Sequence, residues 1–283
     1  MVRGSAKTRT ERVAAASVAA MAVLVLLFLI APILAILPLS VNDSEYLTYP
    51  MRGFTTRWYE AVFSSEKWRL AVINSFLIGI PATLIATLLG TPAAIGLSLA
   101  EFRGKKLVTV LLLSPLVVPI VIVAVGLYFF FAPLGLTQSY TGLIVAHAAL
   151  GAPFVVVTVG AALASFDRGL VRAAASLGAP PVTVFFRVML PLLGRGVVSG
   201  ALFAFAISFD EVVTVLLLGA PHQRTIPREM FSGLRESFNP TIAAVATMLT
   251  VLAIVLLLLI EWLRARTASM TGRSEGGVKA NWF

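Results

Sequence analysis

The chain has 283 residues, of which 59% are hydrophobic and only 12% are charged. A soluble domain is about half apolar and about a quarter charged, so this excess of apolar residues is expected to lie in lipid. The formal net charge of +9 does not indicate a nucleic-acid-binding protein, because the basic residues flank apolar runs and form no groove interleaved with aromatics. The absence of cysteine excludes disulfides and thiolate metal sites.

The first twelve residues are basic and precede a long apolar run, Val13–Leu39. A cleaved signal peptide has an apolar core of only about 7–15 residues, so we favour a retained first span over a removed leader. We therefore predict a cytoplasmic tail over residues 1–12, and a first transmembrane helix with a periplasmic loop over residues 13–69.

Five further stretches approach or exceed the roughly 20 apolar residues that cross a bilayer. The sequence predicts an all-α, polytopic membrane bundle of about six transmembrane helices, with a permease core over residues 70–266 and a polar cytoplasmic tail over residues 267–283. The five stretches are Leu70–Ala100, Leu107–Ala132, Tyr140–Ser165, Gly196–Gly219 and Thr241–Leu263.

The basic residues orient these spans. If the N-terminus lies inside, the cytoplasmic pieces (residues 1–12, 101–106, 166–195 and 264–283) hold 15 of the 22 Lys and Arg residues, and the outer pieces hold 7. Because positive charge accumulates on the cytoplasmic side, both termini are predicted to be cytoplasmic.

The longest cytoplasmic loop, residues 166–195, is expected to hold two short helices joined by an elbow. Asp167 is a good N-cap for the first helix, and Gly178 stands where a left-handed residue would end it. Pro180 and Pro181 suit the first turn of the second helix, which Pro191 is expected to close. The predicted apolar stripes are Leu170, Ala173, Ala174 and Leu177 on the first helix, and Val182, Phe185, Phe186 and Met189 on the second.

The spacing in this loop resembles a known signature. Arg172-Ala173-Ala174, three residues, Gly178, nine residues, Val188, one residue and Leu190-Pro191 are similar to the Glu-Ala-Ala loop of ABC importer permeases. The resemblance implies a type I importer fold and a coupling helix that docks into a cleft of an ATPase subunit. It assigns that contact to Arg172, Ala173, Ala174, Leu177, Gly178, Ala179, Phe185 and Pro191.

One position departs from the family pattern, since Arg172 replaces the Glu. A glutamate there would meet a basic patch on the ATPase, which an arginine cannot do. Either the partner ATPase carries a compensating acid, or a second permease subunit holds the standard loop.

Further motifs resemble the spermidine/putrescine class of these permeases: Ser208 to Val213, Thr225-Ile226-Pro227 and Met230 to Arg235. The resemblance implies import of a small charged solute, with a polyamine favoured. Related members serve γ-aminobutyrate, opines or phosphonates, which remain alternatives.

Asp210 and Glu211 lie in the predicted fifth span, where a charge costs about 2.5–3.5 kcal/mol. With Ser208 and Phe209 they are candidates for the translocation path of a cation. The alternative is a hydrogen bond or ion pair that stabilises the bundle. His147 is expected to be packed or hydrogen-bonded, and no metal-binding constellation occurs in the sequence.

No Gly-x-x-x-x-Gly-Lys-Ser/Thr motif occurs, so the energy source is expected in another subunit, which would bind ATP and Mg²⁺. An ion-coupled secondary transporter is the alternative, but the paired broken helices of that class are not evident. An intramembrane enzyme has no candidate catalytic site, and no cofactor is expected in this chain. The family resemblance implies a second, different permease chain, an ATPase dimer, a periplasmic binding protein that contacts Ala220–Pro240, and a location in the bacterial inner membrane.

Overall fold

A computed structural model describes residues 8–164, 166–236 and 240–270. It is all-helical apart from turns and one isolated β-bridge between Asn42 and Phe54 in the described chain. The described residues form two compact units, one from residues 8–64, 233–236 and 240–253, the other from residues 65–164, 166–232 and 254–270.

The smaller unit contains α1 (Arg9–Leu39) and α2 (Arg57–Ser64). The buried side chain of Asn42 fixes the loop between them, because it accepts a hydrogen bond from the Arg52 amide and donates to the Thr48 carbonyl. Trp58 donates through Nε1 to the Asn42 carbonyl. By contrast, the apolar side chains of α1 are largely exposed, as a lipid-facing span requires.

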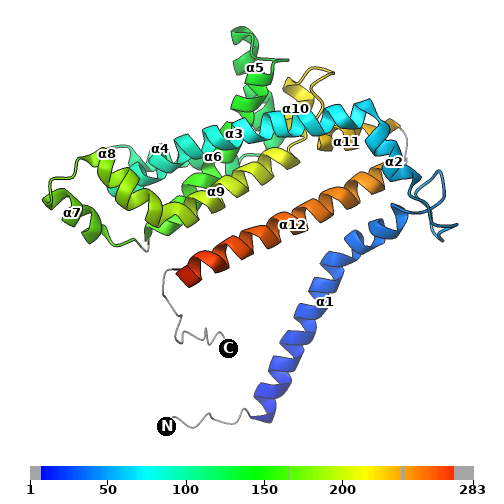
Figure 1. The fold of residues 1–283 in the computed structure, drawn as a ribbon, viewed down its shortest axis with the longest axis horizontal. Helices are drawn as coiled ribbons and strands as arrows, with labels where there is room; N and C mark the ends of the chain where they lie inside the picture. The colour runs from blue at the N-terminus through cyan, green and yellow to red at the C-terminus, as the bar shows by residue number, and fades with distance from the viewer. Residues whose placement is uncertain (1–7, 165, 237–239, 271–283) are drawn as a thin grey trace. The chain divides into compact units, whose positions relative to one another are not determined.

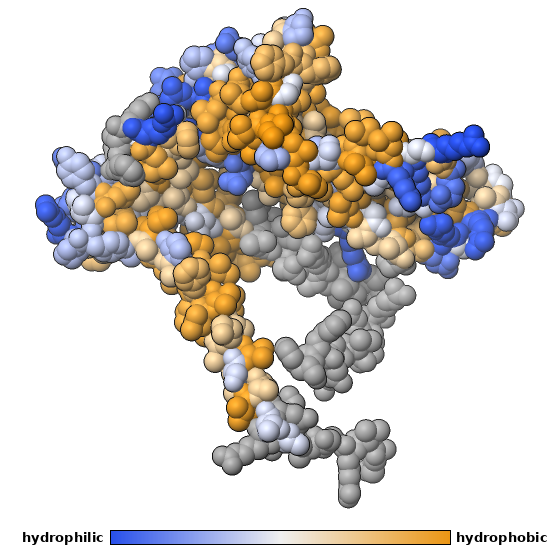
Figure 2. All heavy atoms as spheres, turned by 180° about the vertical axis from the view of Figure 1, so that it is seen from behind, coloured by the Kyte–Doolittle hydropathy of each residue, from blue (hydrophilic) through white to orange (hydrophobic). Residues whose placement is uncertain are grey.

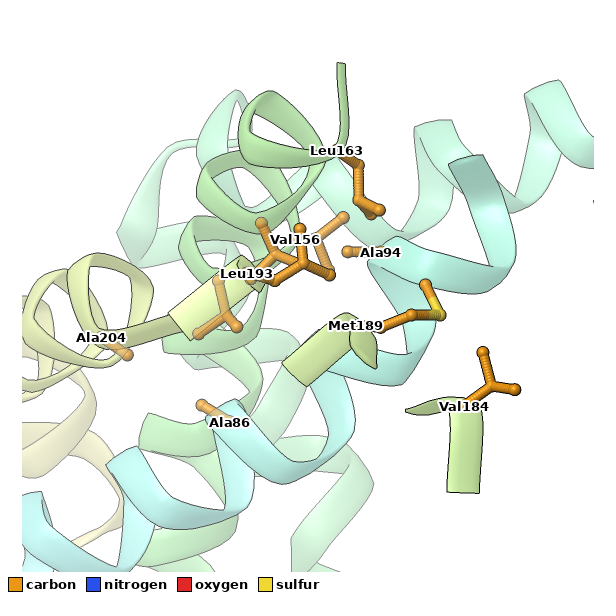
Figure 3. Close-up of a cluster of buried hydrophobic side chains, with 10 residues drawn as sticks. Ala86, Ala94, Val156, Leu163, Val184, Met189, Leu193 and Ala204 are labelled. Atoms are coloured by element: carbon orange, nitrogen blue, oxygen red, sulfur yellow. The ribbon is translucent and has the colours of Figure 1, made fainter. Parts of the chain in front are cut away.

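The larger unit is built on α3 (Glu66–Leu99), α6 (Tyr140–Ala164) and α9 (Leu190–Asp210), which lie side by side (Figure 1). Lipid is as apolar as leucine, so such helices associate through close packing. Gly200 allows the closest approach, since a Cβ there would lie 2.5 Å from Thr158 Oγ1. The buried cluster between the helices (Figure 3) comprises Ala86, Ala94, Val155, Val156, Val159, Leu163, Val184, Met189, Leu193 and Ala204.

The predicted third span is not one straight helix. It consists of α4 (Lys105–Leu113) with a 3-10 turn (Ser114–Leu116), and α5 (Ile120–Phe131) with a second 3-10 turn (Ala132–Leu134). The two halves meet at 107°. Pro115 and Pro119 lack an amide donor and cannot continue a helical hydrogen-bond ladder, which explains the bend.

The predicted fifth span also differs from the structure. Its helix, α9, begins earlier and ends at Asp210 instead of reaching Gly219. Glu211 has an extended backbone (φ −75°, ψ 120°), and the short α10 follows over Val213–Leu218. The predicted continuous helix from Gly196 to Gly219 is therefore wrong.

Within the described residues, four helices are long and apolar enough to cross a membrane, and the number rises to five if the bent pair is counted as one span. The sixth predicted span lies in α12 (Thr241–Met270), whose shorter apolar portion is Thr241–Val255. Over the larger unit, the face shown in Figure 2 is mostly hydrophobic in the middle and hydrophilic toward the ends. Both patterns agree with a membrane bundle.

Candidate functional site

Two short helices, α7 (Arg168–Ser176) and α8 (Pro181–Val184), extend from one end of the larger unit (Figure 1). Asp167 caps α7, because its Oδ1 accepts a 2.7 Å hydrogen bond from the Gly169 amide. Arg168 donates to the Ser98 carbonyl at the end of α3. Gly178 ends α7 with φ +83°, so the predicted N-cap and the predicted left-handed elbow are both confirmed.

The second half of this loop runs directly into the membrane helix. Pro181 starts α8, as predicted, and a π-helical turn over Phe185–Met189 then continues into α9. Pro191 lies in the first turn of α9, where proline is tolerated because that amide needs no intrahelical partner. The prediction that Pro191 closes the second loop helix is therefore wrong.

Only part of each predicted apolar stripe faces the core. Val171, Ala174 and Ala179 pack against the cluster that contains buried Val184 and Met189. Leu177 is 89% exposed, and Leu170, Ala173, Val182 and Phe186 are also exposed. The predicted stripe on α7 thus divides into an inward residue, Ala174, and an outward apolar surface. Phe185, in the turn after α8, is half-buried.

Arg172 lies on the exposed side of α7 and makes no side-chain hydrogen bond or ion pair with any described residue. Its charge is available to a partner. Together with the exposed Leu177, it gives this end of the molecule an apolar and positively charged surface.

The four residues predicted to line a translocation path have different environments. Asp210 is exposed, and its carboxylate makes no hydrogen bond or ion pair within the described part of the chain. Glu211 is buried and accepts a 2.7 Å hydrogen bond from the Thr214 amide, which satisfies a free donor at the start of α10. The helix break thus separates one free carboxylate from one that stabilises the fold.

Ser208 and Phe209 also make contacts within the bundle. The buried Ser208 hydroxyl is 2.8 Å from Nδ1 of the buried His147, which joins α9 to α6. The prediction that His147 is packed and hydrogen-bonded is confirmed. The Phe209 ring packs against Phe76 and Phe205 at centroid distances of 5.4 and 5.3 Å.

At the other end of the larger unit, α11 (Ile226–Glu236) and the 219–225 loop are held by a polar network. Asn74 of α3 donates to the carbonyls of His222 and Arg224, and its own Oδ1 accepts from the Tyr140 hydroxyl. Ser75 accepts from the Ile226 amide. From the sequence, Asn74-Ser75 is expected to cap or kink the start of the second span, but α3 begins at Glu66 and the pair bonds the outer loop instead.

Known proteins resemble the chain over most of its length. Residues 68–269 match the family described as binding-protein-dependent transport system inner membrane component. The chain belongs to this family. The helical membrane core agrees with this assignment, so the protein is a transport permease component.

Two relatives illustrate the match. A spermidine/putrescine transport system permease protein (PotC) of Haemophilus influenzae is 33% identical over 232 residues, covering 82% of this chain and 90% of the relative. A putrescine transport system permease protein (PotI) of Escherichia coli K12 is 33% identical over 229 residues, covering 78% and 81%.

A solved structure shares the fold. The bacterial alginate ABC transporter in complex with an alginate-pentasaccharide-bound periplasmic protein contains a chain with a TM-score of 0.69 and 19% identity, covering 92% of this chain and 96% of that one. The protein has the ABC importer permease fold, which confirms the predicted architecture.

Proposed function

We propose that this chain is the membrane-spanning subunit of an ATP-driven importer for polyamines in a bacterial inner membrane. A periplasmic binding protein delivers the solute, a second permease chain completes the pathway, and a dimer of partner ATPase subunits binds ATP and Mg²⁺. The α7–α8 surface transmits the ATPase movement to α9. The similarity to two polyamine permeases carries the choice of solute.

Asp210 supports a cationic solute. Its exposed carboxylate follows directly on α9 and is not neutralised by any described side chain. Irregular backbone at membrane depth is tolerated where it is buried in protein or lines a cavity. A free carboxylate at such a helix break is suited to contact a passing ammonium group, because the two charges attract each other.

Uptake measurements test the proposal. The complete importer in proteoliposomes, supplied with internal ATP and its binding protein, should accumulate radiolabelled putrescine or spermidine. Excess unlabelled polyamine should compete, whereas γ-aminobutyrate and phosphonate should not. ATP-dependent uptake of one of these competitors in place of polyamine would assign the alternative solute, and uptake driven by an ion gradient without ATP would refute the importer mechanism.

A further inference from the structure

A small pocket is lined by residues of α3, of α11 and of the loop before α11. The α11 helix lies at the end of the larger unit opposite α7 and α8 (Figure 1). The volume of the pocket is about 240 Å³, and Glu229 is the sole acid among the described residues that line it. We call it the α11 pocket. It is lined by Lys67, Leu70, Ala71, Asn74, Pro221, His222, Arg224 and Glu229.

Two cations share one carboxylate in this pocket. Lys67 Nζ lies 2.5 Å from Glu229 Oε1, and Arg224 Nη1 lies 3.2 Å from Glu229 Oε2. The Glu229 side chain is only 1% exposed, whereas those of Lys67 and Arg224 are 50% and 36% exposed. Among the described residues that line the pocket, the two cations are therefore partly exposed, whereas the one carboxylate is buried.

A third cation lies close by. Arg228 donates to the carbonyls of Gly219 and Ala220, and burial together with the charge of Arg224 lowers its pKa. A cationic solute is repelled by this arrangement, whereas a carboxylate is attracted. The pocket is thus unsuited to hold a polyamine and is suited to receive an acidic side chain.

The pocket is also rigidly connected to the membrane helices. The 219–225 loop that forms one wall is bonded to Asn74 of α3, and Tyr140 of α6 bonds to the same Asn74. A force applied at the pocket therefore reaches two of the three core helices directly, without passing through a flexible linker.

We propose that the α11 pocket is a docking point at which Lys67 and Arg224 bind an acidic side chain of the periplasmic binding protein. This inference rests on the proposed importer function and on the charge distribution, which places the α3 start and α11 outside the membrane. Charge complementarity identifies the partner group, because the exposed lining charges are the cations Lys67 and Arg224.

The test uses the complete importer in nanodiscs of zwitterionic lipid, titrated with the solute-loaded binding protein of the same importer. ATPase stimulation gives the apparent Kd and the maximal rate. The variants are Lys67→Gln and Arg224→Gln, with Lys67→Arg as the charge-conserving variant. Arg69→Gln is the matched control, because Arg69 is on the same helix, is exposed and pairs with Glu66 outside the pocket.

Each Gln variant should raise the apparent Kd about fivefold, the upper range for one partly exposed ion pair, and should weaken its salt dependence. The maximal rate should stay unchanged, and Lys67→Arg and Arg69→Gln should behave as wild type. An unchanged Kd, an equal effect of Arg69→Gln, or a lower maximal rate and melting temperature at constant Kd would overturn the proposal. An effect that requires anionic lipid would assign the pocket to a lipid headgroup and also overturn it.

The chain's lack of cysteine offers a direct second measurement. His222→Cys places the only thiol of this subunit at the pocket, where benzophenone-maleimide should cross-link the binding protein. Labelling of lipid alone would contradict the proposal. If the wild-type importer shows no stimulation by any binding protein, the proposed function fails instead, so the two failures are distinguishable.

Discussion

At the α7–α8 end of the larger unit, the chain is held mainly by apolar packing of Val171, Ala174 and Met189, with one capping carboxylate. At the α11 end, the 219–225 loop and the start of α11 are held by hydrogen bonds to the buried residues Asn74 and Ser75. The first arrangement leaves an apolar and charged surface exposed, as a docking element requires. The second arrangement removes polar groups from solvent and fixes a loop in one position.

Of the substitutions at the two ends, the one at the α11 end should lower the stability of the protein most. Asn74→Ala leaves two carbonyls and the Tyr140 hydroxyl, all part-buried, without their partner, so we expect a loss of about 2–3 kcal/mol from the unsatisfied groups. Asp167→Ala at the other end removes one exposed cap and should cost only about 1 kcal/mol. Melting of the purified complex in detergent measures the stability loss of each variant, and equal losses would contradict the expected difference between the two ends.

A smaller energetic effect with a large functional effect is expected at Gly178. Its φ of +83° costs an L-residue about 1–2 kcal/mol, so Gly178→Val should move the elbow and uncouple ATP hydrolysis from uptake. The helical Gly194, whose Cβ position is open, provides the control in Gly194→Val. Normal uptake with normal ATPase stimulation in Gly178→Val would refute a coupling role.

Substitutions of the two adjacent carboxylates at the helix break should have different effects. Glu211→Ala removes the cap on the Thr214 amide and should lower stability by about 1 kcal/mol. Asp210→Asn should reduce polyamine uptake at an unchanged melting temperature, because Asp210 supports no described contact. Both variants are measured by proteoliposome uptake and by melting. Stability loss in Asp210→Asn would indicate a structural role instead.

The smallest effect is expected from Arg172. If its exposed guanidinium pairs with an acid on the ATPase, Arg172→Glu should weaken assembly about fivefold, as for an exposed ion pair. An acid-to-lysine change on the ATPase should restore affinity. Ser176→Ala on the same exposed helix is the control. Unchanged assembly in Arg172→Glu would show that the arginine makes no contact with the ATPase.

Local signals in the sequence predicted the loop well. Asp167 and Gly178 act through their own backbone and their nearest neighbours, so residue type and spacing were sufficient. The end of α9 at Asp210 was missed, because no proline or glycine marks it and the Glu211 cap becomes visible only in the structure. The Lys67–Glu229 pair joins residues far apart in the sequence, so single-sequence periodicity could not have found it.

The close contact at Gly200 has a mechanical consequence. Because a Cβ at Gly200 would lie only 2.9 Å from the Val155 Cα, α6 and α9 are packed closely enough there for a tilt of one helix to be passed to the other. With 21 residues, α9 is about 30 Å long, so a tilt of about 10° around its middle moves each end by roughly 3 Å. One end carries α8, and the other carries Asp210, where the helix ends. When α9 tilts about its middle, its loop end and its Asp210 end thus move in opposite directions, each by about the diameter of a water molecule.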